Sequence, residues 1–132
     1  MKSSKSIGLV LGSLLFTGLF SGLVNAQSAV VLYNERVVEI DQTLPDATEL
    51  WVTPEDLTRI NDFVLKPQGA CLAELCIPIL QDRDSDMFVT RANQGWLNFS
   101  GLADKLQQAS MTDYNDGIWS FGTMPLERQS FF

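Results

Sequence analysis

The sequence predicts an α+β fold: a small single domain of short strands and hairpins with two short helices. Two β-branched runs, Ala29–Tyr33 and Arg36–Ile40, flank Asn34-Glu35 and predict a hairpin near the start of this domain. Thr53 begins a Thr-Pro-Glu-Asp segment that is typical of a helix start. Asp116-Gly117, directly before an aromatic run, predicts a further hairpin near the end.

The first helix is predicted to follow a short strand at Glu49–Val52. Thr53 can cap this helix, and Pro54–Asp56 supply a proline for the first helical position and two acids for the positive helix end. Leu57 and Ile60 keep helical spacing, so the helix is expected to lay one apolar face on the core.

A hairpin that contains both cysteines is predicted after the first helix. Phe63–Leu65 has the composition of a strand, and Pro67–Gly69 turns the chain towards Cys71. Cys76–Leu80 is another apolar stretch, and Pro78 inside it predicts an edge strand, because proline cannot donate a ladder hydrogen bond.

The second half of the chain repeats this mixture of strands and turns. A charged loop at Gln81–Asp86 precedes a predicted strand at Met87–Thr90 and a turn at Ala92–Gly95. The last hairpin is expected to pair Met111–Tyr114 with Ile118–Phe121.

The second helix is predicted over about Gly101–Ala109, with Asn98 or Ser100 as its cap. Three residues at helical spacing are expected to face the core: Leu102, Leu106 and Ala109.

The first 26 residues have the organisation of a cleaved secretory signal peptide. Lys2 and Lys5 precede an uncharged run at Ser6–Val24, and Val24-Asn25-Ala26 forms a small-x-small exit. An uncleaved membrane anchor is the alternative, although glycines and serines dilute the apolar run. The expected organisation is a signal peptide at 1–26, the α+β domain at 27–121 and a C-terminal tail at 122–132. We therefore expect a periplasmic or secreted protein without stable membrane insertion.

The charge of the exported chain excludes some partners. Removing Lys2 and Lys5 leaves seven basic residues against sixteen acidic ones, a net charge of −9. Such a surface repels nucleic acid and anionic lipid, so we expect no nucleic-acid partner. It favours a basic partner or a cation, or it serves only solubility.

The absence of histidine from the sequence argues against catalysis and transition-metal binding. Ser-His-Asp and Cys-His mechanisms cannot be assembled from this chain alone, and the commonest zinc and copper ligand is missing. The alternating acids of Asp82–Asp86 lack the glycine of a calcium loop at Met87 and its final glutamate at Asn93. We expect no enzyme activity, no cofactor and no metal site.

Cys71 and Cys76 form an isolated pair five residues apart, and a structural disulfide is the first interpretation for an exported protein. A redox-active pair is an alternative, since a short bridge can be easier to reduce. No Lys, Arg or His flanks either thiol in the sequence to lower its pKa. Free thiols or metal binding are the remaining alternatives.

Three tryptophans are candidate binding residues: Trp51, Trp96 and Trp119. They could line an aromatic groove for a glycan, a peptide or an apolar ligand. The alternative is core packing, because large aromatic side chains contribute heavily to burial in a small domain.

A shift of 45 residues aligns two parts of the chain. Trp51 then falls on Trp96, Val52 on Leu97, Thr53 on Asn98 and Leu57 on Leu102. The sequence therefore predicts a duplicated strand-helix-hairpin unit, with chance agreement as the alternative.

Two families resemble this chain. AVVLYNERVVEI followed by TELWVTPEDLTRI resembles the copper amine oxidase N-terminal-like (stalk) domain, a generally non-catalytic module, and implies no copper here. LWVTPEDLTRINDFVLKPQGACLAELCIPI, with GWLNFSGLADKL and DGIWSFG, is similar to the N-terminal accessory segment of bacterial redoxin (thioredoxin-like) proteins. That resemblance implies an accessory domain, and only 122–132 remain where a redoxin domain would follow.

These observations give three functional hypotheses. The first is an exported, non-catalytic domain that binds a partner protein or an envelope component. The second is a redox accessory protein that uses Cys71 and Cys76. The third is a binder of an apolar ligand through an aromatic groove.

Overall fold

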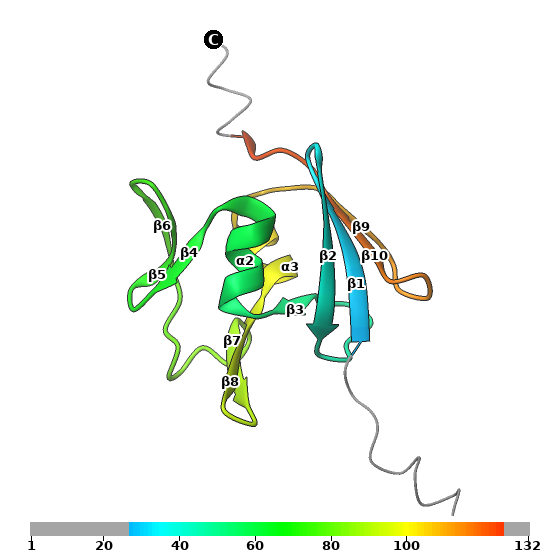
Figure 1. Cartoon of the computed structure of the whole chain (residues 1–132). Helices are drawn as coiled ribbons and strands as arrows, with labels where there is room; N and C mark the ends of the chain where they lie inside the picture. Colours follow the sequence, from blue (N-terminus) through cyan, green and yellow to red (C-terminus); the bar gives the residue numbers. More distant parts are fainter. Residues whose placement is uncertain (1–26, 126–132) are drawn as a thin grey trace, which may run out of the picture.

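The computed structural model describes residues 27–125, and this part of the chain forms an α+β domain in which two helices lie among three small sheets (Figure 1). The predicted fold class is confirmed. The predicted signal peptide and residues 126–132 of the predicted tail lie outside the described residues.

A four-stranded sheet brings both ends of the described chain together. Its strands are β1 (Gln27–Tyr33), β2 (Arg36–Thr43), β9 (Ser110–Asp113) and β10 (Ile118–Phe121), in the order β2-β1-β10-β9. The two predicted hairpins are therefore confirmed, and β1 joins them by running parallel to β10. Asn34 adopts a φ of 55° in the first turn, a conformation that asparagine tolerates better than most residues.

Two three-stranded sheets complete the fold. One consists of β3 (Trp51–Val52), β8 (Gln94–Asn98) and β7 (Phe88–Arg91), in that order. The other consists of β4 (Val64–Lys66), β5 (Gly69–Leu72) and β6 (Leu75–Pro78). The proline-containing strand β6 lies at an edge of its sheet, as predicted.

Helix α2 (Pro54–Asn61) begins as the sequence predicts. The Thr53 side chain accepts a hydrogen bond from the Asp56 backbone N–H at 3.2 Å, and Leu57 and Ile60 are fully buried. The helix ends at Asp62, whose φ of 67° is incompatible with a further helical turn.

Helix α3 (Phe99–Lys105) lies earlier than predicted. Asn98 caps it by accepting a 2.8 Å hydrogen bond from the Gly101 N–H, so the helix starts at the next residue. Gln107 then takes a φ of 60°, which ends the helix. The prediction that Ala109 faces the core from this helix is wrong, because Ala109 lies beyond that reversal and is exposed.

The core forms where both helices meet the sheets. Its largest fully buried side chains come from all parts of the described chain: Phe63, Phe99, Ile40, Leu50, Leu57, Ile60, Ile79, Leu97, Leu102, Val31 and Val52. Phe99 makes edge-to-face contacts with Tyr33 and Phe121, which ties α3 to the four-stranded sheet. Met124 is also buried in this core, so the packed domain continues past Phe121 into the segment predicted as tail.

Candidate functional site

The three candidate tryptophans differ in exposure. Trp96 and Trp119 are 7% and 4% exposed, whereas Trp51 is half-buried. Each tryptophan nevertheless lines a different surface hollow. Core packing therefore describes two of the three side chains, and a role in binding stays a prediction.

Two adjoining hollows, which we call the Trp groove, lie between the segment Gln42–Asp46 and the hairpin of β7 and β8. One is about 530 Å³ and is lined by Trp96; the other is about 350 Å³ and is lined by Trp51. They adjoin because the same three residues line both: Leu44, Pro45 and Arg91.

Further hollows extend the Trp groove at both ends. A hollow of about 470 Å³ shares Trp51 and Ser85 with it, and one of about 430 Å³ that Trp119 lines shares Thr43. The sequence indicated the tryptophans as candidate binding residues, but it did not indicate that residues 42–46 connect the hollows that they line. This segment, which begins at the end of β2, carries no aromatic or charged residue before Asp46, and only its tertiary position makes it a wall of the groove.

Asp46 fixes the loop and orients Trp51. One carboxylate oxygen accepts hydrogen bonds from the Thr48 N–H at 2.9 Å and the Glu49 N–H at 3.1 Å; the other accepts from Trp51 Nε1 at 3.0 Å. Partial burial disfavours the charged carboxylate, but these hydrogen bonds outweigh that effect and hold the pKa of Asp46 below its ordinary value. The indole is therefore held in one orientation at the end of the groove.

The walls of the Trp groove combine apolar and polar groups. Leu44, Pro45 and Val89 supply apolar surface. Arg91 is exposed, so its guanidinium can donate hydrogen bonds to a ligand or pair with a ligand carboxylate. Gln94 adds an amide beside Trp96.

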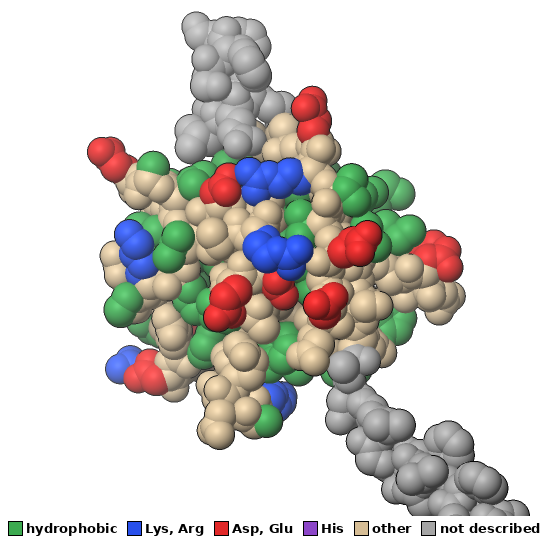
Figure 2. Space-filling model, in the orientation of Figure 1, with side chains coloured by type: hydrophobic (Ala, Val, Ile, Leu, Met, Phe, Trp, Pro, Cys, Tyr) green, Lys and Arg blue, Asp and Glu red, His purple; other side chains and the backbone are tan. Residues whose placement is uncertain are grey.

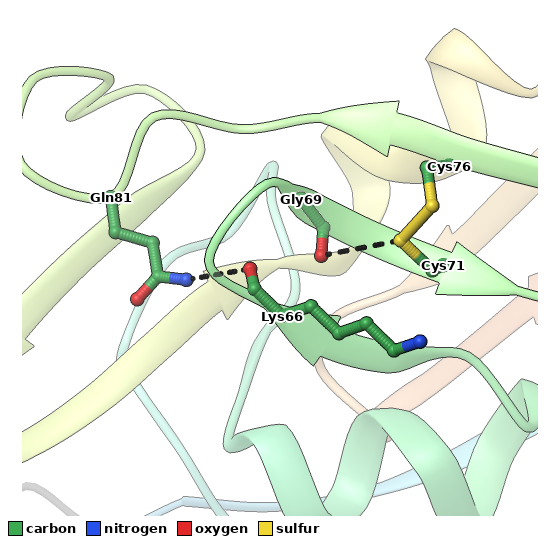
Figure 3. Close-up of a disulfide and its surroundings, with 5 residues drawn as sticks. All are labelled: Lys66, Gly69, Cys71, Cys76 and Gln81. Atoms are coloured by element: carbon green, nitrogen blue, oxygen red, sulfur yellow. Dashed lines mark hydrogen bonds between the residues drawn. A yellow bond between two sulfur atoms is a disulfide. The ribbon is translucent and has the colours of Figure 1, made fainter.

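The disulfide between Cys71 and Cys76 joins two residues that lie directly opposite each other in β5 and β6, with their Cα atoms 4.0 Å apart. The two cysteines that the sequence analysis paired are thus disulfide-bonded, and the described residues contain no free cysteine. The two half-cystines differ in accessibility, because Cys71 is 2% exposed and Cys76 is exposed. Figure 3 shows the bridge with Cys71 Sγ 3.9 Å from the Gly69 carbonyl oxygen.

Lys66, five residues before Cys71, lies on the same sheet face as the disulfide. Cys71 pairs with Val64 and Gly69 pairs with Lys66, so strand alternation places Lys66 on the same face as Cys71 at a diagonal position. Gln81 Nε2 donates a 3.0 Å hydrogen bond to the Lys66 carbonyl oxygen and fixes this strand (Figure 3). The sequence places no cation directly beside either cysteine, and it does not show that strand pairing brings Lys66 onto the face of Cys71.

The structure adds no metal ligand set. No group of three or more His, Cys, Asp or Glu side chains is arranged to hold a metal ion within residues 27–125. In the same residues, neither helix has the length and hydropathy of a membrane span.

Comparison of this chain with protein-family models, with curated proteins and with solved structures gives no significant match. The resemblances stated above accordingly stay predictions.

Proposed function

We propose that this protein is an exported, non-catalytic domain that binds an extended segment of a partner protein in the Trp groove. The observation that carries this proposal is the sharing of Leu44, Pro45 and Arg91 by two hollows that end on Trp96 and Trp51. A continuous, partly apolar groove of this kind suits an extended chain better than a compact small molecule. The signal-like residues 1–26 support export.

The free edge of strand β7 supports a polypeptide ligand over a glycan. The two-residue turn at Ala92-Asn93 makes Arg91 and Gln94 a hydrogen-bonded pair of the hairpin. Hydrogen-bonded and non-hydrogen-bonded pairs alternate along the strands, so the N–H and C=O of Thr90 point away from β8. Among residues 27–125, strand β7 has no neighbouring strand other than β8, and Thr90 is exposed. An extended peptide could pair with these groups while its side chains enter the groove.

Site-directed photo-cross-linking tests the proposal. A photoreactive amino acid replaces Gln94 in the groove or, as a control, the exposed residue Glu74 in the turn between β5 and β6. We expect a discrete cross-linked partner in the envelope fraction from position 94 only, and its loss when Arg91→Ala is added. Equal products at both positions, or none at position 94, would contradict the proposal.

A redox accessory role is the second candidate, and the exposure of Cys76 favours it. An external thiolate could attack Cys76 Sγ and release the Cys71 thiolate on the face that carries Lys66. Measuring the reduction potential of the bridge distinguishes the candidates. A value of about −120 to −270 mV would place it with exchange catalysts, and a value below about −300 mV would mark a structural bridge.

A further inference from the structure

The outer face of the four-stranded sheet carries a row of apolar side chains. Leu32 lies between Val37 and Ser120 in neighbouring strands, and Ser120 lies beside Met111. Val37 is 69% exposed and Met111 is 77% exposed, the largest values among the large hydrophobic residues of residues 27–125. An antiparallel hairpin normally directs polar residues towards solvent, so apolar side chains in this row need a separate explanation.

The next row on the same face joins apolar and acidic side chains. Val30 and Ile118 lie side by side at its centre, with Glu39 and Asp113 at its two ends. The centre of the face is thus formed by Val30, Leu32 and Ile118, and its margin carries apolar side chains in the first row and carboxylates in the second. We call these two rows the outer sheet face.

No Lys or Arg of the four strands lies on the outer sheet face, although Arg59 of α2 donates a 3.1 Å hydrogen bond to the Glu39 backbone carbonyl oxygen at its edge. Arg36 is the only Lys or Arg in the four strands, and its side chain is directed to α2, where it bonds the Ile60 carbonyl oxygen at 3.0 Å and Asp62 at 2.6 Å. Figure 2 shows hydrophobic and acidic side chains, without Lys or Arg, on the side of the molecule where Figure 1 places β1, β9 and β10.

This charge pattern selects among the candidate occupants. A second copy of the chain would bring Glu39 and Asp113 against the same carboxylates, and an anionic lipid surface would repel them. A polypeptide with apolar side chains flanked by Lys or Arg would bury the central residues and pair with the carboxylates at the margin.

We infer that the outer sheet face is a second docking surface, separate from the Trp groove, for a cationic amphipathic segment of a partner polypeptide. None of the residues of the outer sheet face lines either hollow of the Trp groove. The two surfaces can therefore be tested independently.

The test measures binding of labelled synthetic peptides to the purified exported chain by fluorescence anisotropy. The probes are an alternating Leu-Lys peptide, an alternating Leu-Glu peptide and an alternating Ser-Lys peptide. We expect saturable, salt-sensitive binding of the Leu-Lys peptide and much weaker binding of the other two. The double variant Val37→Ser/Met111→Ser should weaken Leu-Lys binding roughly tenfold, as expected for about 1.4 kcal/mol of lost contact.

Leu80→Ser is the matched control, because Leu80 is also exposed, at 53%, but lies outside the four-stranded sheet. This variant should bind the Leu-Lys peptide like the wild type. The inference is overturned if the double variant binds as well as the control, or if the Ser-Lys peptide binds as tightly as the Leu-Lys peptide. It is also overturned if Val37→Ser/Met111→Ser only abolishes self-association in sedimentation, or only abolishes binding to anionic vesicles. Photo-cross-linking from position 94 should be unchanged in the double variant.

Discussion

Val52 and Leu97 lie directly opposite each other in the antiparallel pair of β3 and β8, and both are fully buried. They are also one of the residue pairs that the 45-residue shift of the sequence superimposes. Trp51 correspondingly lies opposite Asn98, the equivalent of Thr53. The central strand pair therefore has the pairing expected of two units related by an approximate two-fold axis.

The same correspondence extends into the helices. Thr53 and Asn98 both cap a helix by accepting a hydrogen bond from the backbone N–H three residues later. Leu57 and Leu102 are both fully buried, four residues after their caps. Each helix then leads into a hairpin, β4–β5 in the first unit and β9–β10 in the second.

The two caps are expected to differ in their contribution to stability. Thr53→Ala should lower the free energy of unfolding by about 1 kcal/mol, a typical value for a lost cap. Asn98→Ala should cost more, about 2–3 kcal/mol, because the buried Asn98 amide also donates to Glu49 and to the Asp86 carbonyl oxygen. Urea denaturation measures both values, with exposed Ser110→Ala as a neutral control. Equal losses would show that the extra hydrogen bonds contribute nothing net.

Gly69 is expected to tolerate no side chain. Its φ is 145°, and a Cβ there would overlap the Ile77 carbonyl oxygen in the neighbouring strand β6. Gly69→Ala should separate β5 from β6 and lower the melting temperature markedly. Gly122→Ala is the matched control, because a Cβ there meets Ala109 atoms only at ordinary contact distances from 3.8 Å. Similar melting temperatures for the two variants would contradict this account.

Two carboxylates should change stability in opposite directions with pH. Asp46 has a lowered pKa, so its contribution is present at neutral pH and is lost as the pH falls through its folded-state pKa. Asp46→Asn should therefore destabilise the protein at pH 7 and have less effect near pH 3.

Asp116 behaves in the opposite way. A hydrogen bond to Asp113, together with repulsion between the two charges, raises the pKa of Asp116, so its contribution is lost as the pH rises through that value. Asp116→Asn should stabilise the protein at pH 7 and not near pH 3. Urea denaturation at both pH values measures the change in the free energy of unfolding for each variant. If both variants stabilise or both destabilise the protein at pH 7, the opposite pKa shifts of Asp46 and Asp116 are wrong.

The disulfide is expected to make a modest contribution to stability. It closes a very short loop, so the loss of unfolded-state entropy amounts to about 2 kcal/mol in the loop-closure account. Replacing Cys71 and Cys76 together by alanine should reduce the free energy of unfolding by no more than about that amount under oxidising conditions. The difference should disappear when the wild type is measured in excess reductant. A much larger loss would mean that the bridge also holds β5 and β6 against the core.

Local signals in the sequence predicted most of the elements correctly. The β1–β2 hairpin, the start of α2 and the β9–β10 hairpin depend on neighbouring residues, and each formed where predicted. The position of α3 was wrong because Asn98 and Ser100 are both acceptable caps by composition. Ser100 instead accepts a hydrogen bond from the Leu50 N–H through its hydroxyl, 50 residues away, which leaves Asn98 as the cap.

The sequence by itself determined the α+β class, the disulfide partners and the candidate tryptophans, because composition, short-range spacing and caps are local properties. Only the tertiary structure decided that residues 42–46 join Trp51 and Trp96 in one groove, and that Lys66 lies on the face of Cys71. It also decided that Val37, Leu32 and Met111 share an outer face, because strand pairing brings together residues that are almost 80 positions apart. Long-range pairing depends on packing of the whole chain, and no local pattern in the sequence encodes it.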